Sequence, residues 1–380
     1  MKISLIYLML LFSMGFLLFS CSNRVKIQET SKVFSITHDY KPNRVLLINQ
    51  NENIFCIAYF KNTDKRIEIT NLRDQDKKVI MLPENVLGQH LLSNNPDTVF
   101  IYDNIYGEIH LLTKDGYVRT LNLLSICGLR NFRLYPPSQI YNNAFYVSGY
   151  DYCLDSNSNS LIESETQILK QIMQNERVFV FKNIFTDSLQ ITQMLNKFVC
   201  DEIVKDSDYV GTDFLKIRIL RNHFICFHAN SNVLYVFNSQ DGKLEEKIEL
   251  FSNYASLKVP LLRLYRSDKE KELFLEQRQE ANFLNGIIYN VTYDEFREIY
   301  YVTTLLPNEN FHYLNNLTFE RDWSLIVLSS DFKELGEFYF KKDEFDFKTI
   351  HPIKEGVLIE KKHDKIENRK TEFVVFEVIK

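Results

Sequence analysis

The chain has 380 residues, of which 45% are hydrophobic and 25% charged, and its formal net charge at pH 7 is −5. A mildly acidic chain lacks the clustered basic charge that a nucleic-acid-binding surface needs, so we expect no nucleic-acid partner. The 14% aromatic content is compatible with strand preference and equally with codon bias, since Asn, Ile and Lys are also abundant.

The first residues predict an export signal. Lys2 precedes an apolar run, Ile3 to Leu18, which is followed by Leu18-Phe19-Ser20-Cys21. This ending resembles the lipobox of bacterial lipoproteins, in which the cysteine is acylated and becomes the mature N-terminus. We expect a signal peptide at 1–20, a lipidated N-terminus and tether at 21–31, and a folded domain at 32–380. The alternative is an uncleaved membrane helix, for which the run is only just long enough.

Five cysteines remain once Cys21 is assigned to lipid: Cys56, Cys127, Cys153, Cys200 and Cys226. They include no CxxC pair, and at most two disulfides are possible. Cys56 and Cys226 lie in strand-like apolar runs, so we expect both to be small buried side chains.

A paired-strand pattern recurs along the chain. In residues 232–250 two strand-like runs flank Asp241-Gly242, a tight-turn sequence. The pattern returns at 108–123 around Asp115-Gly116 and at 324–340 around Asp331. Some of these units are close to the roughly 40–45 residues of a propeller blade, and the longer ones predict insertions.

We therefore expect an all-β, six-bladed β-propeller. Its last segment supplies only three strands, so the N-terminal segment must add the outer strand that closes the ring. Lys32 to Tyr40 is the first candidate for that strand and Val25 to Gln28 is the second. The expected blades cover residues 44–82, 87–123, 132–195, 213–250, 286–340 and 347–379.

All the long connections fall on one face of the predicted ring. They are residues 124–131, 149–175, 196–212, 251–285 and 305–322. Binding residues concentrate on loops held by a rigid scaffold, so we expect function on this face. The alternative is that the insertions only cap the ring. Residues 164–174 and the capping-box sequence at Ser267 to Glu270 predict helices.

Arginine and aromatic residues on the predicted face could hold an anionic or glycan ligand, because arginine supplies paired donors and aromatic rings a flat apolar surface. Several of them could instead cap blade edges. The candidate ligand-binding residues are Arg130, Arg133, Tyr150, Asp151, Tyr152, Arg263, Arg266, His312, Tyr313, Arg321 and Trp323, with Tyr135 and Tyr265 beside them.

No catalytic motif is present: the chain has no GxSxG, HExxH, Walker or GxGxxG sequence. His223 and His228 are five residues apart in a strand and point to opposite faces, which makes them poor joint metal ligands. Residues 155–159 begin like a calcium loop, but Ser160 and Thr166 replace its glycine and its final glutamate. We expect neither a cofactor nor a metal.

Two phrases, YNVTYDEFREIYYV (289–302) and RDWSLIVLSSDFKELGEFYF (321–340), together with the lipobox, resemble an uncharacterised family of Bacteroidetes lipoproteins, a domain-of-unknown-function group. The resemblance implies a six-bladed, TolB-like propeller anchored in the outer membrane. Residues 22–26 lack the acidic run of surface-exported members, which favours the periplasmic side. The family supplies no catalytic residues.

The sequence favours a monomeric, non-enzymatic binding or scaffold module for a protein or glycan. The alternative is a hydrolase or lyase acting on carbohydrate or a lactone, and a third hypothesis is an envelope sensor without a small ligand. Fold alone does not choose among them. Converging carboxylates or histidines would favour the enzyme, and an apolar, aromatic-rimmed patch would favour a partner surface.

Overall fold

The computed structural model describes residues 25–62, 64–86, 88–103, 106–123, 132–141, 144–151, 177–182, 190–193, 209–210, 215–220, 223–229, 231–239, 242–308, 321–362 and 369–379. Nearly all regular structure in these residues is β-strand, and α5 (Asp268–Leu284) is the helix among them. Within the same residues, no helix is long and apolar enough to cross a membrane.

The strands form six four-stranded antiparallel sheets. In chain order, the first sheet contains β2 (Arg44–Gln50), β3 (Asn53–Phe60), β4 (Arg66–Asn71) and β5 (Lys77–Met81), and the second contains β6 (His90–Asn95), β7 (Thr98–Asp103), β8 (Glu108–Thr113) and β9 (Gly116–Asn122). The third contains β10 (Phe132–Tyr141), β11 (Ala144–Asp151), β12 (Arg177–Lys182) and β13 (Gln190–Gln193), and the fourth contains β15 (Leu215–Leu220), β16 (His223–His228), β17 (Val233–Asn238) and β18 (Leu244–Glu249). The fifth contains β20 (Ile287–Asp294), β21 (Ile299–Leu305), β22 (Trp323–Leu328) and β23 (Glu334–Phe340).

The remaining four-stranded sheet joins the two ends of the chain. It contains β24 (Phe345–Ile353), β25 (Gly356–Lys361), β26 (Lys370–Ile379) and β1 (Lys26–Thr37). A separate two-stranded sheet pairs β14 (Tyr209–Val210) with β19 (Leu262–Arg263).

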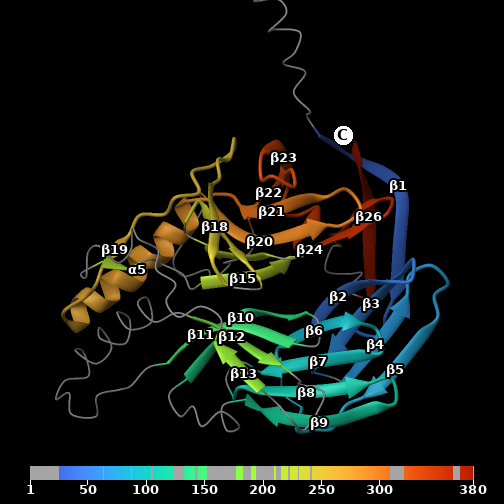
Figure 1. Cartoon of the computed structure of the whole chain (residues 1–380). Coiled ribbons are helices and arrows are strands. Elements are labelled where there is room, and N and C mark those ends of the chain that lie inside the picture. Colours follow the sequence, from blue (N-terminus) through green and yellow to red (C-terminus); the bar gives the residue numbers. More distant parts are fainter. Residues whose placement is uncertain are drawn as a thin grey trace, which may run out of the picture.

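One edge strand of each sheet lies innermost, and in the last sheet it is β24. The innermost strands β2, β6, β10, β15, β20 and β24 contact one another in this order, and β24 returns to β2. A hydrogen bond from the side-chain amide of Asn49 on β2 to the carbonyl of Pro352 on β24, at 2.8 Å, joins the first of them to the last. This arrangement is a β-propeller, so the predicted fold class is confirmed at that level (Figure 1).

Burial follows strand position, which explains the sequence pattern. The middle strands are covered on both faces: every residue of β22 is buried, as is every residue of β21. The outer strand β18 is exposed except at Ile248. Cys56 and Cys226 are buried, as predicted, and both carry free thiols. Gly116 and Gly242 have φ of +128° and +68°, which confirms that glycine provides the expected turns.

The predicted pairing of the N-terminal segment with the last sheet is confirmed. β1 runs antiparallel to β26, from Lys26 opposite Ile379 to Thr37 opposite Lys370, at the right edge of Figure 1. Both candidate segments contribute, and the register shifts between Glu29 and Val33. The tether prediction needs correction, since residues 26–31 belong to this strand. Their backbone groups pair with β26, which would otherwise be an open edge.

A buried ionic cluster lies where the closing strand leads into the first sheet. The Glu68 carboxylate accepts from His38 Nδ1 at 2.8 Å, Arg66 Nε at 3.0 Å and Lys77 Nζ at 2.8 Å. Burial alone would raise the pKa of Glu68, but these three donors hold it below its ordinary value. Burial lowers the pKa of His38. The cluster therefore joins His38, which follows β1, to Glu68 on β4 and Lys77 on β5, so its role is structural.

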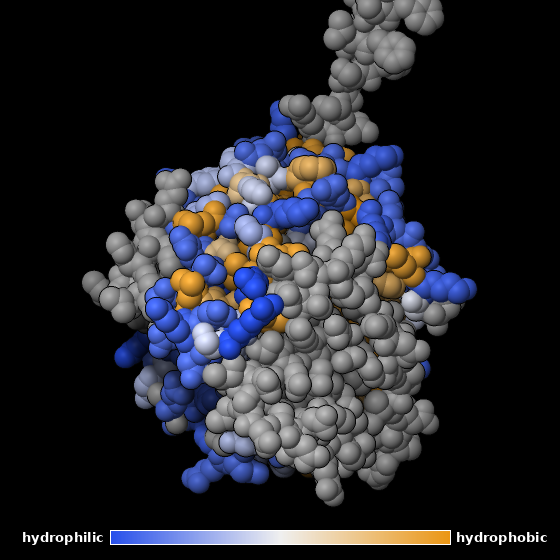
Figure 2. Space-filling view, turned by 90° about the vertical axis from the view of Figure 1, so that its left-hand side faces the viewer, coloured by the Kyte–Doolittle hydropathy of each residue, from blue (hydrophilic) through white to orange (hydrophobic). Residues whose placement is uncertain are grey.

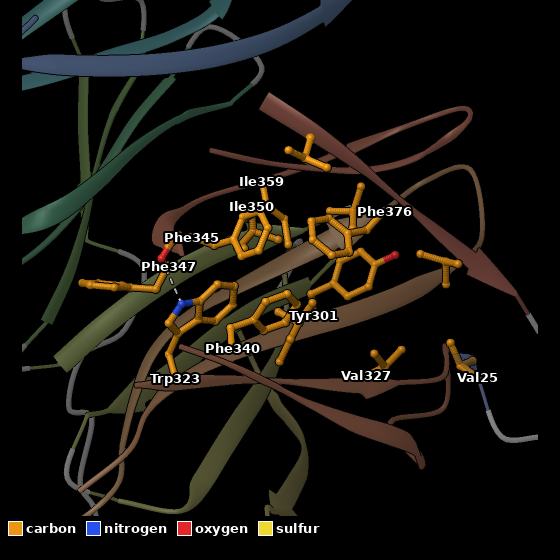
Figure 3. Packing of buried hydrophobic residues seen from close by; sticks show 14 of the residues in the cluster. Val25, Tyr301, Trp323, Val327, Phe340, Phe345, Phe347, Ile350, Ile359 and Phe376 are labelled. Carbon is orange, nitrogen blue, oxygen red and sulfur yellow. Dashed lines mark hydrogen bonds between the residues drawn. The ribbon is translucent and has the colours of Figure 1, made fainter. Parts of the chain in front are cut away.

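Trp323 is a core residue, which corrects its prediction as part of the ligand-binding face. Its indole is fully buried, stacks on Phe340 at a centroid distance of 4.1 Å, and donates to the Phe345 carbonyl at 3.2 Å. Figure 3 shows it packed among aromatic side chains of the last two sheets. Both faces of β22 are covered, so no rotamer could carry this ring to the surface.

Candidate functional site

Antiparallel connectivity sorts the connections onto two faces. Links from the last strand of one sheet to the first strand of the next emerge at the ends where β2, β15, β20 and β24 begin. We call this end the looped face. It carries the described insertion at residues 251–285, which joins β18 to β20. The opposite face carries short turns, such as residues 51–52 between β2 and β3.

The innermost strands bring three charged side chains and a tyrosine together toward the looped face. Arg44 lies on β2, Arg218 on β15, Tyr289 on β20 and Asp346 on β24. Burial raises the pKa of the Tyr289 hydroxyl, while the charges of Arg218 and Arg44 oppose this shift and that of Asp346 adds to it. These four side chains, from four sheets, therefore lie within electrostatic reach of one another. Together with Glu360 they are called the ring centre below.

Two carboxyl groups lie side by side in the ring centre. Asp346 on β24 is directly opposite Glu360 on β25, so their Cβ atoms are about 5 Å apart. Burial, and then the Asp346 charge, raise the pKa of Glu360 to about 7, although the Thr349 hydroxyl donates to it at 3.1 Å. One carboxyl of the pair can therefore hold a proton near neutral pH, as a general acid or base must.

Arg218 is a deeply placed cation. Its Nε donates to the Asn290 side-chain oxygen and its Nη1 to the carbonyl of Ile217 at 2.8 Å. Burial lowers its pKa to about 10, so the guanidinium is still charged at neutral pH. Within the described chain, no carboxylate lies in salt-bridge distance of it, although buried charges are usually paired.

The ring-centre side chains keep some accessible surface. Arg218, Tyr289 and Glu360 are only partly buried, yet burial is the largest influence on the pKa of each.

Local backbone irregularity aims these side chains. The register of β20 shifts between Ile288 and Asn290, and that of β24 between Asp346 and Ile350. A bulge re-aims the residues that flank it and is common beside functional sites. At the first bulge Tyr289 turns onto Phe347, with edge-to-face rings 4.7 Å apart, while Asn290 accepts from Arg218.

The insertion at residues 251–285 is held firmly on the looped face. Ser267 caps α5 by accepting from the Glu270 amide at 3.2 Å, and Glu270 accepts from the Arg266 amide at 2.6 Å, so the predicted helix start is confirmed. Phe274 packs on Tyr265, with ring centroids 5.5 Å apart. The two ends of the insertion are joined by a hydrogen bond from the Gly286 amide to the Ser256 carbonyl at 2.8 Å.

Arg321 holds this insertion in place through hydrogen bonds, which corrects the prediction that it is a ligand-binding residue. Its side chain is buried and donates to the carbonyls of Leu306, Asn282 and Asn285 at 2.5 to 2.6 Å. The last carbonyls of a helix have no hydrogen-bond donors within the helix, and Arg321 donates to those of Asn282 and Asn285 at the end of α5. Burial lowers its pKa to about 10.

Exposed apolar side chains concentrate on the insertion. Of the sixteen large hydrophobic residues that are exposed in the described chain, six lie in residues 251–284: Phe251, Tyr254, Leu261, Leu273, Leu275 and Leu284. Phe251 is 67% exposed, and the Tyr254 ring lies 5.6 Å from that of Tyr339 on β23. Figure 2 shows hydrophobic side chains interspersed with hydrophilic ones over this side of the molecule.

The other predicted face residues have different outcomes. Arg263 and Arg266 are exposed on the insertion, and Tyr265 is buried there. The backbones of Arg133 and Tyr150 pair across β10 and β11, with Asp151 opposite Phe132. Arg130, Tyr152, His312 and Tyr313 lie outside the described residues, as do Cys21, the predicted helix at 164–174 and the calcium-like loop at 155–159.

Sequence reasoning missed Arg218, Asp346 and Glu360. One indication was available for the first: in residues 215–220, Lys216 and Arg218 alternate with apolar residues in a strand that begins a blade. Alternation in an innermost strand means that one face is not packed against apolar neighbours. Within the described residues, no group of three histidine, cysteine or acidic side chains could hold a metal ion.

No protein-family model matches the chain, and no curated protein matches it. Among solved structures, a member of the DUF4221 family from Bacteroides vulgatus is similar, with a TM-score of 0.69 and 14% identity, over 94% of this chain and 99% of that one. A protein from Bacteroides fragilis has a TM-score of 0.48 and 9% identity over 95% and 97% of the two chains. The β-propeller domain of Myceliophthora Swd1 has a TM-score of 0.44 and 8% identity, over 90% of this chain and 99% of that one. At 14% identity the first similarity supports the propeller fold alone, and the other two are too distant to carry an argument.

Proposed function

We propose that the protein is a lipid-anchored envelope propeller that binds a protein or glycan partner through its looped face. The observation that carries this proposal is the concentration of exposed apolar side chains on one firmly held insertion. Scattered exposed hydrophobic residues are ordinary, but this one insertion carries six of the sixteen exposed large hydrophobic residues of the described chain, which supports a recognition surface there. Tyr254 and Phe251 are of the aromatic type that is enriched in interfaces.

We propose that the scaffold beneath this face is a six-bladed ring. The six four-stranded sheets and the cyclic contacts of their innermost strands support this count. Closure by β1 leaves no open strand edge in the last sheet. Such a ring would fix the insertion relative to the ring centre, so that a partner meets a preformed surface.

The partner surface is tested by substitution of three exposed residues, Phe251→Ser, Tyr254→Ser and Leu273→Ser, in one variant. The matched control carries Val79→Ser and Met81→Ser, which replace exposed residues of the outer strand β5. After cross-linked capture from envelope extract, we expect the intact protein and the control to retain a common partner that the triple variant loses. Equal retention by all three proteins would contradict the proposal.

The lipid anchor rests on the Leu18-Phe19-Ser20-Cys21 sequence. Cys21→Ser removes the thiol that would be acylated, so the variant should leave the membrane fraction and lose its incorporated palmitate. Fractionation of cells labelled with radioactive palmitate measures both. Continued membrane association of an unlabelled Cys21→Ser protein would contradict the anchor. We place the anchored protein at the outer membrane, facing the periplasm.

A second candidate function, a hydrolase or lyase acting on carbohydrate or a lactone, is favoured by the Asp346 and Glu360 pair. Two neighbouring carboxyl groups, one of which has its pKa raised to about 7, are a common acid and base arrangement. A turnover screen of envelope glycans and lactones, run with intact protein and with Glu360→Gln, tests it. Turnover that the substitution abolishes would support the enzyme, and no turnover by the intact protein would leave the binding module as the proposal.

A further inference from the structure

Cations and carboxyl groups meet in the ring centre. Arg44 and Arg218 contribute cations from β2 and β15, and Asp346 and Glu360 contribute two carboxyl groups, of which Glu360 holds a proton for part of the time near neutral pH. Lys216 places its ammonium group over the Tyr289 ring, 5.5 Å from the centroid. Lys216 and Arg218 are two residues apart on one strand, so they project from the same face of it.

Arg218 differs in its partners from three other arginines of the described chain that are buried or partly buried. Arg66 and Arg297 each pair with a buried carboxylate, and Arg321 donates to four carbonyls. Arg218 has one side-chain amide and the carbonyl of its own neighbour. A guanidinium offers five donors in a planar fork that matches a carboxylate, and here Nε and Nη1 are the nitrogens whose hydrogen bonds are identified.

The surroundings of Arg218 suit a small organic ligand. The Tyr289 ring, set by its contact with Phe347, forms an apolar wall beside the two cations. The Tyr289 hydroxyl stays protonated at neutral pH because burial raises its pKa, so it can donate a hydrogen bond. A ligand that brought a carboxylate to Arg218 would supply the counter-charge that the described chain does not, and would leave its remaining atoms against this ring.

We propose that the ring centre is a binding site for a small organic anion whose carboxylate pairs with Arg218. The site is separate from the apolar surface of the 251–285 insertion and does not require catalysis. Since the anion binds the folded protein and neutralises a partly buried charge, it should raise the free energy of unfolding by RT ln(1 + c/Kd), where c is the concentration of the anion.

The test compares thermal unfolding of the full-length protein in detergent, in sodium chloride, sodium malonate and sodium glucuronate at equal ionic strength. The proteins are the intact chain, Arg218→Met, Arg218→Lys and, as a matched control, Arg73→Met, which changes an exposed arginine in the turn between β4 and β5. Methionine keeps the length of the side chain without its charge, and lysine keeps the charge without the planar fork.

We expect malonate or glucuronate to raise the Tm of the intact protein and of Arg73→Met above the value in chloride. Calorimetric titration should give a Kd that Arg218→Lys weakens at least tenfold and Arg218→Met abolishes. In chloride, Arg218→Met should melt at or above the intact protein, because it removes a buried charge without a counter-ion.

Two results would overturn the proposal. An equal rise in Tm in Arg218→Met would mean that the anions act through solvent and not at this site. No rise in the intact protein, together with a lower Tm of Arg218→Met in chloride, would mean that Arg218 is a structural residue satisfied by Asn290 and Ile217. If Arg218→Met does not fold, Arg218→Lys still tests the proposal, because its Kd for the anion should be at least tenfold weaker than that of the intact protein.

Discussion

At the scale of single residues, strand register decides which charged groups meet. Asp346 and Glu360 are fourteen residues apart and lie side by side only because β24 pairs with β25, so their spacing in the sequence does not reveal the pair. Flanking apolar residues do predict the burial of Cys56 and Cys226, and both are buried. Position on the predicted face makes Arg321 and Trp323 candidate ligand residues, yet Arg321 holds the insertion and Trp323 is a core residue.

Glu360 gives the residue-scale prediction. Its pKa is about 7 in the folded protein against an ordinary value of 4.5, so the folded state binds more protons than the unfolded state between these values. Stability should therefore fall as pH rises from about 4.5 through 7, by up to about 3 kcal/mol. Glu360→Gln should remove this slope and leave a protein more stable than the intact chain at pH 8. Urea unfolding at pH 5, 6, 7 and 8 measures it, and parallel slopes for the two proteins would contradict the assignment.

At the scale of elements, strand patterns were readable because burial in this fold depends on strand position. The middle strands are covered on both faces and the outer strand β18 is mostly exposed, so most boundaries of the expected blades agree with those of the sheets to within one or two residues. The bulges in β20 and β24 were not readable, since one extra residue in a strand leaves the apolar pattern nearly unchanged. These bulges aim Tyr289 and its neighbours, which is why the site was harder to predict than the fold.

The cap of α5 gives the element-scale prediction. Ser267→Ala removes the acceptor of the Glu270 amide and should cost about 1 kcal/mol. Ser267→Asp is the matched control, because aspartate caps as well as serine does. Hydrogen exchange should speed up in residues 268–274 of Ser267→Ala while the amides of β22 stay protected. Faster exchange throughout β22 would instead mean that α5 is part of the ring's cooperative unit.

At the scale of the whole molecule, the end-to-end pairing of the chain was predictable from a count of strands. Three strands in the last segment left one edge open, and β1 covers it with nine registered residue pairs. What the sequence did not show is the ionic cluster around Glu68, which fastens the exit of that strand to the first sheet. It forms between residues that are adjacent only after closure.

Deletion of residues 22–40 tests the closure. The variant loses β1 and exposes the backbone edge of β26, so its Tm should fall by about 10 °C or more and its unfolding should become less cooperative. Calorimetry measures both. The matched control, deletion of residues 22–24, shortens the chain before β1 and should melt like the intact protein. An unchanged cooperative transition after the longer deletion would contradict a ring held by its two ends.

The most direct test of the central claim is site-specific photo-cross-linking in intact cells, with a photoreactive phenylalanine placed at either of two exposed phenylalanine positions. Phe251 lies on the looped-face insertion, and Phe296 lies in the turn between β20 and β21 on the opposite face. A binding module that uses the looped face predicts a discrete adduct from position 251 and none from position 296. An adduct from position 296 alone, or none from either position, would contradict it.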